Sequence, residues 1–184
     1  MAPDPWGVEL QPSNALSFDG MTVLVIDDNQ HMRGIVGALL RAFGIGRLHF
    51  ADNGATAIDC VNRTMVDLAI ADWYMEPTDG IAFTRHIRLQ GDSPDPYLPI
   101  ILMTGFTERS RIDVARDAGV NEILAKPLSP ESLYRKMTAV VRQPRSYIKA
   151  RGYFGPDRRR RALPGFTGPP RRRGDAVAAA FQGG

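Results

Sequence analysis

The chain has 184 residues, of which 43% are hydrophobic and 23% charged, and its formal net charge is +3. This length fits one domain with a tail and is too short for two ordinary domains. No apolar run reaches the 18 residues that span a bilayer, and the N-terminal segment lacks the basic and apolar regions of a secretory signal. The single cysteine, Cys60, excludes an internal disulfide, and we interpret it as a buried small residue. We expect a cytoplasmic protein.

The net charge conceals a division along the chain. Residues 1–141 carry a formal charge of −6, whereas residues 142–184 carry +9. Of the 23 basic residues in the whole chain, 20 are arginine. An acidic body is therefore followed by a basic, arginine-rich tail.

Short apolar runs alternate with segments of helical periodicity from residue 21 onward, after an extension over residues 1–19. Continuous apolar runs predict strands at 21–26, 48–51, 68–71, 100–103 and 123–125. Apolar residues spaced by three and four predict helices at 29–43, 54–64, 80–89, 109–118 and 130–141. Asn53 and Ser129 are the expected N-caps of two of these helices.

This alternation predicts an α/β fold with a doubly wound, five-stranded parallel sheet over residues 20–142. A basic C-terminal extension, residues 143–184, follows this domain. In such sheets the ligand site lies at the carboxyl ends of the strands, near the switch in strand order. Residues that directly follow an apolar run are therefore the candidates for chemistry.

Polar side chains follow four of the five predicted strands. The first strand ends in Asp27 and Asp28, the third in Asp72, the fourth in Thr104 and the fifth in Lys126. Three like charges repel one another by about 4 kcal/mol per pair at 4 Å and an effective dielectric constant of 20. One lysine offsets only part of that repulsion, so the set predicts a hard divalent cation, Mg²⁺, with oxygen ligands.

Each of these features alone is typical of a helix cap, a turn or a solvated surface, but together they all end apolar runs at one sheet edge. The set resembles the CheY-like receiver domain of bacterial response regulators over about residues 20–142. The resemblance rests on four segments in order: Val25-Ile-Asp-Asp28, Asp72-Trp-Tyr-Met-Glu-Pro-Thr-Asp-Gly80, Met103-Thr-Gly105 and Lys126-Pro127.

The resemblance implies a role for each residue of the set. Asp72 is then the phosphoacceptor, which takes a phosphoryl group from a histidine kinase or a phosphotransfer protein. Asp28 and Asp72 bind Mg²⁺ together with the backbone carbonyl of Tyr74, and Asp27 binds it through water. Thr104 and Lys126 each hold a phosphoryl oxygen. These roles agree with the needs of phosphoryl transfer, which are positioning and charge neutralisation.

Three positions depart from the family pattern. The proline expected four residues after Asp72 is replaced by Glu76, and Pro77 follows it. Tyr74 is bulky at a position that can shield the phosphoryl group, which predicts slow self-dephosphorylation. Ile123 stands where the family has an aromatic switch residue, so either coupling runs differently or phosphorylation is not the main input.

The basic tail leaves several interpretations open. It is too short and too poor in apolar residues for a DNA-binding output domain. Its Pro/Gly content and like-charge runs are typical of a disordered, solvated tail. Other hypotheses are electrostatic contact with RNA or an anionic membrane, and docking on the acidic body in one signalling state.

A further hypothesis for the tail is a guanine nucleotide ligand. The arginine-rich tail is similar to that of the Cle group, CheY-like proteins that bind cyclic di-GMP and act on the flagellar motor. This resemblance implies ligand contacts at Arg151, Tyr153, Phe154, Arg158, Arg159, Arg160 and Arg161. Arginine offers a planar fork for guanine or phosphate and stacks on rings.

We therefore expect a single-domain response regulator that signals through protein–protein contact, with the flagellar motor switch as one possible target. Its only expected chemistry is self-phosphorylation and self-dephosphorylation, so we do not expect an enzyme. The alternatives are a cyclic di-GMP effector that does not depend on phosphorylation, and a tail that binds RNA or an anionic surface.

Overall fold

The computed structural model describes residues 18–91, 93–105 and 109–158. A five-stranded parallel sheet with the strand order β2-β1-β3-β4-β5 forms its centre. Its strands are β1 Thr22–Ile26, β2 Arg47–Ala51, β3 Leu68–Asp72, β4 Ile100–Thr104 and β5 Glu122–Ala125. The helices between and after them are α1 Gln30–Ala42, α2 Gly54–Arg63, α3 Gly80–Leu89, α4 Arg109–Ala118 and α5 Pro130–Arg142. The structure confirms the predicted α/β fold, and each predicted strand or helix end lies within one residue of the observed one.

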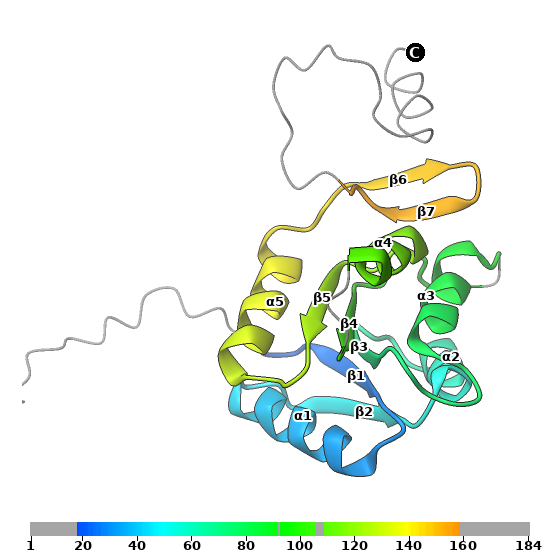
Figure 1. Ribbon diagram of the computed structural model, residues 1–184. Helices are drawn as coiled ribbons and strands as arrows, with labels where there is room; N and C mark the ends of the chain where they lie inside the picture. Colours follow the sequence, from blue (N-terminus) through cyan, green and yellow to red (C-terminus); the bar gives the residue numbers. More distant parts are fainter. Residues whose placement is uncertain (1–17, 92, 106–108, 159–184) are drawn as a thin grey trace, which may run out of the picture.

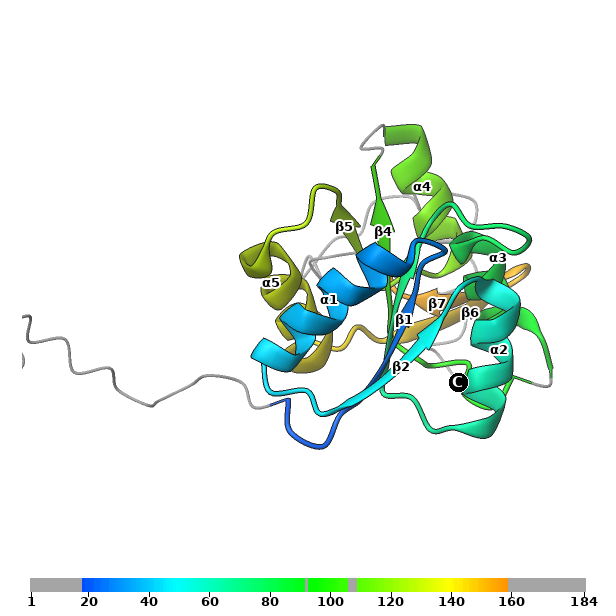
Figure 2. The same ribbon diagram turned by 90° about the horizontal axis from the view of Figure 1, so that it is seen from below.

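Helices cover both faces of the sheet. α1 and α5 lie on one face, and α2, α3 and α4 lie on the other (Figures 1 and 2). Side chains of a strand point alternately to the two faces, so Leu24 and Ile26 join one core cluster while Val23 and Val25 join the other. Every residue of β1, β3 and β4 is buried, so these three strands are almost entirely apolar, which is the pattern that predicted them. The outer strands β2 and β5 are partly exposed and include charged residues, Arg47 and Glu122.

The helix ends follow from local capping. Asn53 and Ser129 are the N-caps of α2 and α5, as predicted, and each forms a reciprocal capping box with the residue three positions on. None of the helices in the described part of the chain is long and apolar enough to cross a membrane. Cys60 is only partly buried and packs against the core beside α2.

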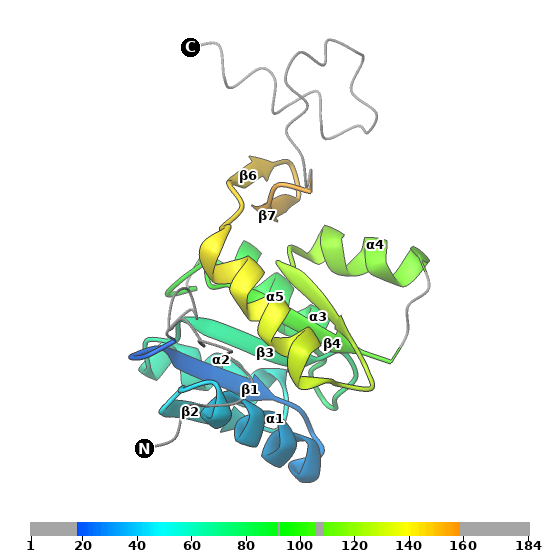
Figure 3. The ribbon, with the colours of Figure 1, turned by 90° about the vertical axis from the view of Figure 1, so that its left-hand side faces the viewer.

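A hairpin follows α5, in the segment that the sequence assigned to the basic tail. Its strands are β6 Tyr147–Ala150 and β7 Tyr153–Pro156, which pair in antiparallel fashion. The hairpin lies beyond the ends of α3 and α4, away from the body of the sheet (Figures 1 and 3). The sequence did not predict this element, so the structured part of the chain extends past α5.

A buried arginine joins segments at the amino edge of the sheet, before β4 and β5. The side chain of Arg88, on α3, is 3% exposed. Its guanidinium donates hydrogen bonds to three backbone carbonyls and one side-chain oxygen, namely those of Gly119 at 3.1 Å, Pro96 at 2.8 Å, Leu98 at 2.7 Å and Asn121 at 3.0 Å. The ring of Tyr147 lies 5.3 Å from the guanidinium and covers it. Arg88 therefore joins α3, two loops and the hairpin.

Close backbone contact completes the docking of the hairpin. A Cβ added to Gly155 would lie 2.8 Å from the Cα of Gly119, and one added to Gly119 would lie 2.9 Å from the carbonyl oxygen of Phe154. Arg158 pairs with Asp117 at 2.8 Å. The two glycines let the hairpin lie directly on the α4–β5 connection.

The loop after β3 is closed by a second glycine contact. The amide of Gly80 donates to the carbonyl of Trp73 at 3.0 Å, and Asp79 caps α3 by accepting from the amide of Ala82. A Cβ added to Gly80 would lie 2.2 Å from the carbonyl oxygen of Asp72. Only glycine permits this approach, which fixes the backbone at the end of β3.

Arg88→Leu tests the role of the buried arginine. Three carbonyls lose their donor and Tyr147 loses the cation that it covers, so we expect the free energy of unfolding to fall by about 3 kcal/mol in urea titrations. Arg85→Leu, at an exposed position of the same helix, should change it by about 0.5 kcal/mol or less. Equal stability of both variants would contradict this account of the hairpin.

Gly80→Ala tests the closed loop. The added methyl group must displace the backbone of Asp72, so the free energy of unfolding should fall by about 2 kcal/mol. The control is Gly91→Ala, because nothing lies within 4 Å of a Cβ at that position. If thermal or urea unfolding shows the two variants to be equally stable, the loop is not held as described.

Candidate functional site

The structure brings all five polar residues of the predicted set to the carboxyl edge of the sheet. Register explains the convergence, because Ile26 pairs with Ala71 and Thr104 pairs with Ala125. The next residues therefore lie side by side: Asp27 directly follows β1, and Asp72 is the last residue of β3. Lys126 directly follows β5. Asp28, next to Asp27, is exposed, whereas Asp27 is 1% exposed and Asp72 is 9% exposed.

Lys126 bridges two of the carboxylates. Its Nζ lies 2.9 Å from Oδ1 of Asp72 and 3.3 Å from Oδ2 of Asp27. Backbone amides fix the same two side chains, since the amide of Asn29 donates to Oδ1 of Asp27 and that of Trp73 donates to Oδ1 of Asp72, both at 2.9 Å. Both carboxylates are thus held in fixed orientations at the site.

Thr104 belongs to the same edge. Its side chain is buried, and its residue is the last of β4. Its carbonyl oxygen accepts a hydrogen bond of 2.7 Å from the amide of Lys126. The end of β4 therefore positions the lysine that contacts Asp72 and Asp27.

Burial and neighbouring charges shift the pKa values of both Asp72 and Lys126. Burial raises the pKa of Asp72, and the charge of Asp27 adds to the rise, although Lys126 opposes both. Burial alone would lower the pKa of Lys126, but the hydrogen bonds and charges of Asp72 and Asp27 outweigh it and raise that pKa. The ammonium is thus held charged beside carboxylates that repel one another.

The three carboxylates have the geometry of a cation site. Oxygen atoms of Asp27, Asp28 and Asp72 all lie within 4.8 Å of one another. Carboxylate oxygens are the donors that Mg²⁺ prefers, and three negative charges face one lysine. The residues present therefore fit the predicted ion. The expected contribution of the Tyr74 carbonyl stays a prediction.

The structure defines the surroundings of two residues that depart from the family pattern, Tyr74 and Ile123. The ring of Tyr74 is 46% exposed and stacks on the buried ring of Trp73, with centroids 6.0 Å apart. The guanidinium carbon of Arg111, on α4, lies 5.6 Å from the centre of the Tyr74 ring. Ile123 is partly buried and packs against the core cluster that contains Ala115 of α4. The sequence did not single out Arg111.

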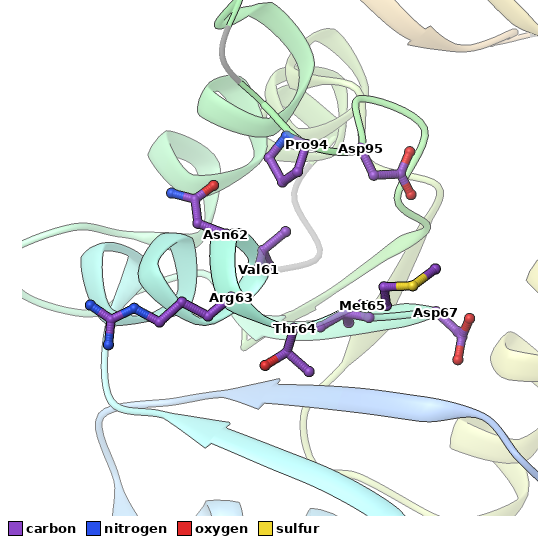
Figure 4. A pocket seen from close by; sticks show the side chains of 9 residues that line it. Val61, Asn62, Arg63, Thr64, Met65, Asp67, Pro94 and Asp95 are labelled. Carbon is purple, nitrogen blue, oxygen red and sulfur yellow. The ribbon is translucent and has the colours of Figure 1, made fainter.

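A pocket lies at the other end of the sheet. It is lined by the end of α2, the α2–β3 connection and the loop before β4, including Met65, Asp67 and Asp95 (Figure 4). Its lining precedes β3 and β4, whereas the polar set follows them. It contains no residue of the predicted site.

The residues predicted for nucleotide binding do not gather in a binding site within the described chain. Arg151 is exposed at the hairpin turn. Tyr153 is buried, its hydroxyl donates to the carbonyl of Pro156 at 2.8 Å, and the guanidinium carbon of Arg158 lies 4.2 Å from its ring centre. Phe154 packs against the rings of two tyrosines, Tyr97 and Tyr147. Arg159, Arg160 and Arg161 lie outside the described residues.

The rings of Tyr153 and Phe154 therefore make contacts within the protein itself. Tyr153 and Phe154 fasten the hairpin, and Arg158 covers one ring while pairing with Asp117. Tyr147 adds a hydrogen bond of 2.8 Å from its hydroxyl to the carbonyl of Tyr97. A planar ligand would have to replace these contacts to stack on Tyr153.

Comparison with known proteins agrees with this geometry. Chemotaxis protein CheY-3 of Vibrio cholerae is 33% identical over 126 residues, which cover 68% of this chain and 95% of the relative. One similar solved structure is the receiver domain of sensor histidine kinase PA1611 from Pseudomonas aeruginosa, which has a magnesium ion coordinated in its active site cleft. It is 28% identical, has a TM-score of 0.58, and the match covers 65% of this chain and 95% of the PA1611 chain.

A second solved structure contains a receiver domain with a partner. It is the co-crystal structure of the Saccharomyces cerevisiae histidine phosphotransfer protein Ypd1 and the receiver domain of Ssk1. The similarity has a TM-score of 0.57 at 25% identity and covers 64% of this chain and 86% of the matched chain. The family model described as "response regulator receiver domain" matches residues 23–138, the segment that contains the whole polar set. The chain belongs to the response regulator receiver domain family.

Proposed function

We propose that Asp72 is the phosphoacceptor of a response regulator and that Asp27, Asp28 and Asp72 hold Mg²⁺ beside it. The observation that carries the proposal is the position of the Asp72 carboxylate, which ends β3 within 2.9 Å of Lys126 and shares a cluster with two further carboxylates. The Mg²⁺ bound to the PA1611 receiver domain supports the same assignment for the ion.

The transfer step follows from these groups. An oxygen of the Asp72 carboxylate attacks the phosphorus of a phosphohistidine, the phosphorus–nitrogen bond breaks, and the released imidazole takes up a proton. Lys126 neutralises charge on the equatorial oxygens, and the Thr104 hydroxyl donates a hydrogen bond to one of them. Mg²⁺, when bound, neutralises the remaining charge. We propose that self-phosphorylation from small donors and self-dephosphorylation are the only reactions that this site carries out on its own.

The partners follow from this chemistry. A histidine kinase or a phosphotransfer protein supplies the phosphoryl group, as the complex of Ypd1 with a receiver domain supports. The output is contact with a target protein. The relatives named as chemotaxis proteins favour a chemotaxis target, of which the flagellar motor switch is our specific hypothesis.

Asp72→Asn tests the acceptor. Incubation with Mg²⁺ and acetyl phosphate should label the wild-type chain, and the variant should lose the label because an amide oxygen is a far weaker nucleophile. Asp113→Asn removes an exposed carboxylate of α4 and should label normally. Undiminished labelling of Asp72→Asn by intact-mass measurement would contradict the proposal.

Asp28→Asn tests the cation site. In a Trp6→Phe background Trp73, next to Asp72, is the only tryptophan, so its fluorescence reports binding. Mg²⁺ should change this fluorescence and raise the midpoint of thermal unfolding, because it binds the folded state. We expect Asp28→Asn to weaken Mg²⁺ binding by at least about tenfold. An affinity equal to that of Asp113→Asn would exclude Asp28 as a ligand.

Cyclic di-GMP binding by the tail stays a hypothesis from sequence. The internal contacts of Tyr153, Phe154 and Arg158 do not favour it, and Arg151 is the one predicted contact residue that the described structure leaves exposed. Calorimetric titration of the full chain and of a chain that ends after residue 158, which keeps the hairpin, decides whether the last arginines bind the nucleotide.

A further inference from the structure

An aromatic pair, Trp73 and Tyr74, directly follows Asp72 in the chain. The backbone amide of Trp73 binds the Asp72 carboxylate at 2.9 Å, and its ring is 6% exposed, so this residue is fixed. The ring of Tyr74 lies nearly parallel to it, at an angle of 19°. Tyr74 is therefore the half-exposed outer member of a stack whose inner member, Trp73, binds the Asp72 carboxylate through its backbone amide.

Arg111 reaches this stack from a different element. It lies in the first turn of α4, and its guanidinium faces the Tyr74 ring at 5.6 Å. This separation is within the range of a cation–π contact. The contact links α4 to the β3–α3 loop, two segments about 40 residues apart in the sequence.

We propose that Arg111 is a positioning residue that holds the Tyr74 ring at the edge of the site and thereby lengthens the lifetime of the phosphorylated state. The inference rests on the proposed function of Asp72. A ring that is 46% exposed would exchange between rotamers if only one face were packed. Arg111 limits that exchange by favouring the rotamer seen in the structure.

The Tyr74 ring affects the lifetime because hydrolysis of the phosphorylated Asp72 requires access for water. In hydrolysis, the oxygen of a water molecule attacks the phosphorus, the bond between phosphorus and the Asp72 oxygen breaks, and the carboxylate leaves while the water proton passes to solvent. The water must approach opposite the leaving carboxylate oxygen. A ring fixed at the rim reduces how often water reaches that position, whereas a mobile ring does not.

The experiment measures the lifetime of the phosphorylated protein. Chains phosphorylated with acetyl phosphate are freed of donor, and the decay of phosphoprotein is followed with Mg²⁺ present. Arg111→Ala should shorten the lifetime by about two- to fivefold, as expected for loss of one cation–π contact between partly exposed groups. Arg111→Lys should lie between it and wild type, and Tyr74→Phe, which keeps the ring, should retain most of the wild-type lifetime.

A double variant separates positioning from a general loss of stability. If Arg111 acts through the ring, then Tyr74→Ala with Arg111→Ala should decay no faster than Tyr74→Ala alone. Arg116→Ala, on the same helix and ion-paired with Asp113 at 3.7 Å, should decay at the wild-type rate. In the unphosphorylated Trp6→Phe background, Arg111→Ala should also increase quenching of Trp73 by acrylamide.

The role of Arg111 and the role of Asp72 as phosphoacceptor can fail separately in these experiments. If the wild-type chain takes no label, or if Asp72→Asn labels equally, the proposed function fails. If labelling depends on Asp72 but Arg111→Ala decays like wild type, or if the effects of Tyr74→Ala and Arg111→Ala multiply, Arg111 does not act through the ring and only this inference is overturned.

Discussion

The parallel register of the central sheet forces three carboxylates together at one edge. Ile26 and Ala71 are register partners, so Asp27, directly after β1, lies beside Asp72, the last residue of β3. Their mutual repulsion is opposed by Lys126, which lies within 3.3 Å of both, and by backbone amides. A site with this excess of negative charge is costly without a cation, which favours the binding of Mg²⁺. The charges of Mg²⁺ and Lys126 would then offset the negative charge of an incoming phosphoryl group.

The remaining contacts keep that edge in place. Gly80 allows α3 to begin against the carbonyl of Asp72, and the Thr104 carbonyl holds the amide of Lys126. At the other end of the sheet, the buried Arg88 joins α3 to the loops that precede β4 and β5 and to the hairpin. One edge of the sheet thus carries the chemistry, while the other is closed by a structural clamp.

The sequence predicted those parts whose determinants are local or repeated. Strands buried on both faces leave continuous apolar runs, and polar residues directly after them mark the edge where parallel strands end. The sequence alone therefore predicted that Asp27, Asp72 and Lys126 lie close together. The N-caps Asn53 and Ser129 were predictable for a similar reason, because a cap is set by residues within one turn.

The parts that the sequence missed depend on contacts between distant segments. The strands of the hairpin have four residues each, and their burial depends on Gly119 and Arg88, which lie far earlier in the chain. The arginine and aromatic residues around Tyr153 suggested a nucleotide site, but in the structure they pack against one another. The contact of Arg111 with Tyr74 likewise joins two elements, and neither residue alone indicates it.

The proposed function requires that one carboxylate at this edge of the sheet, that of Asp72, accepts the phosphoryl group. Borohydride reduction of the phosphorylated chain converts an aspartyl phosphate to homoserine, which peptide mass spectrometry can locate. The account predicts that position 72 alone is converted, and only after treatment with a phosphodonor and Mg²⁺. Conversion at Asp27 or Asp28 instead, or the absence of conversion in a chain that carries the label, would contradict it.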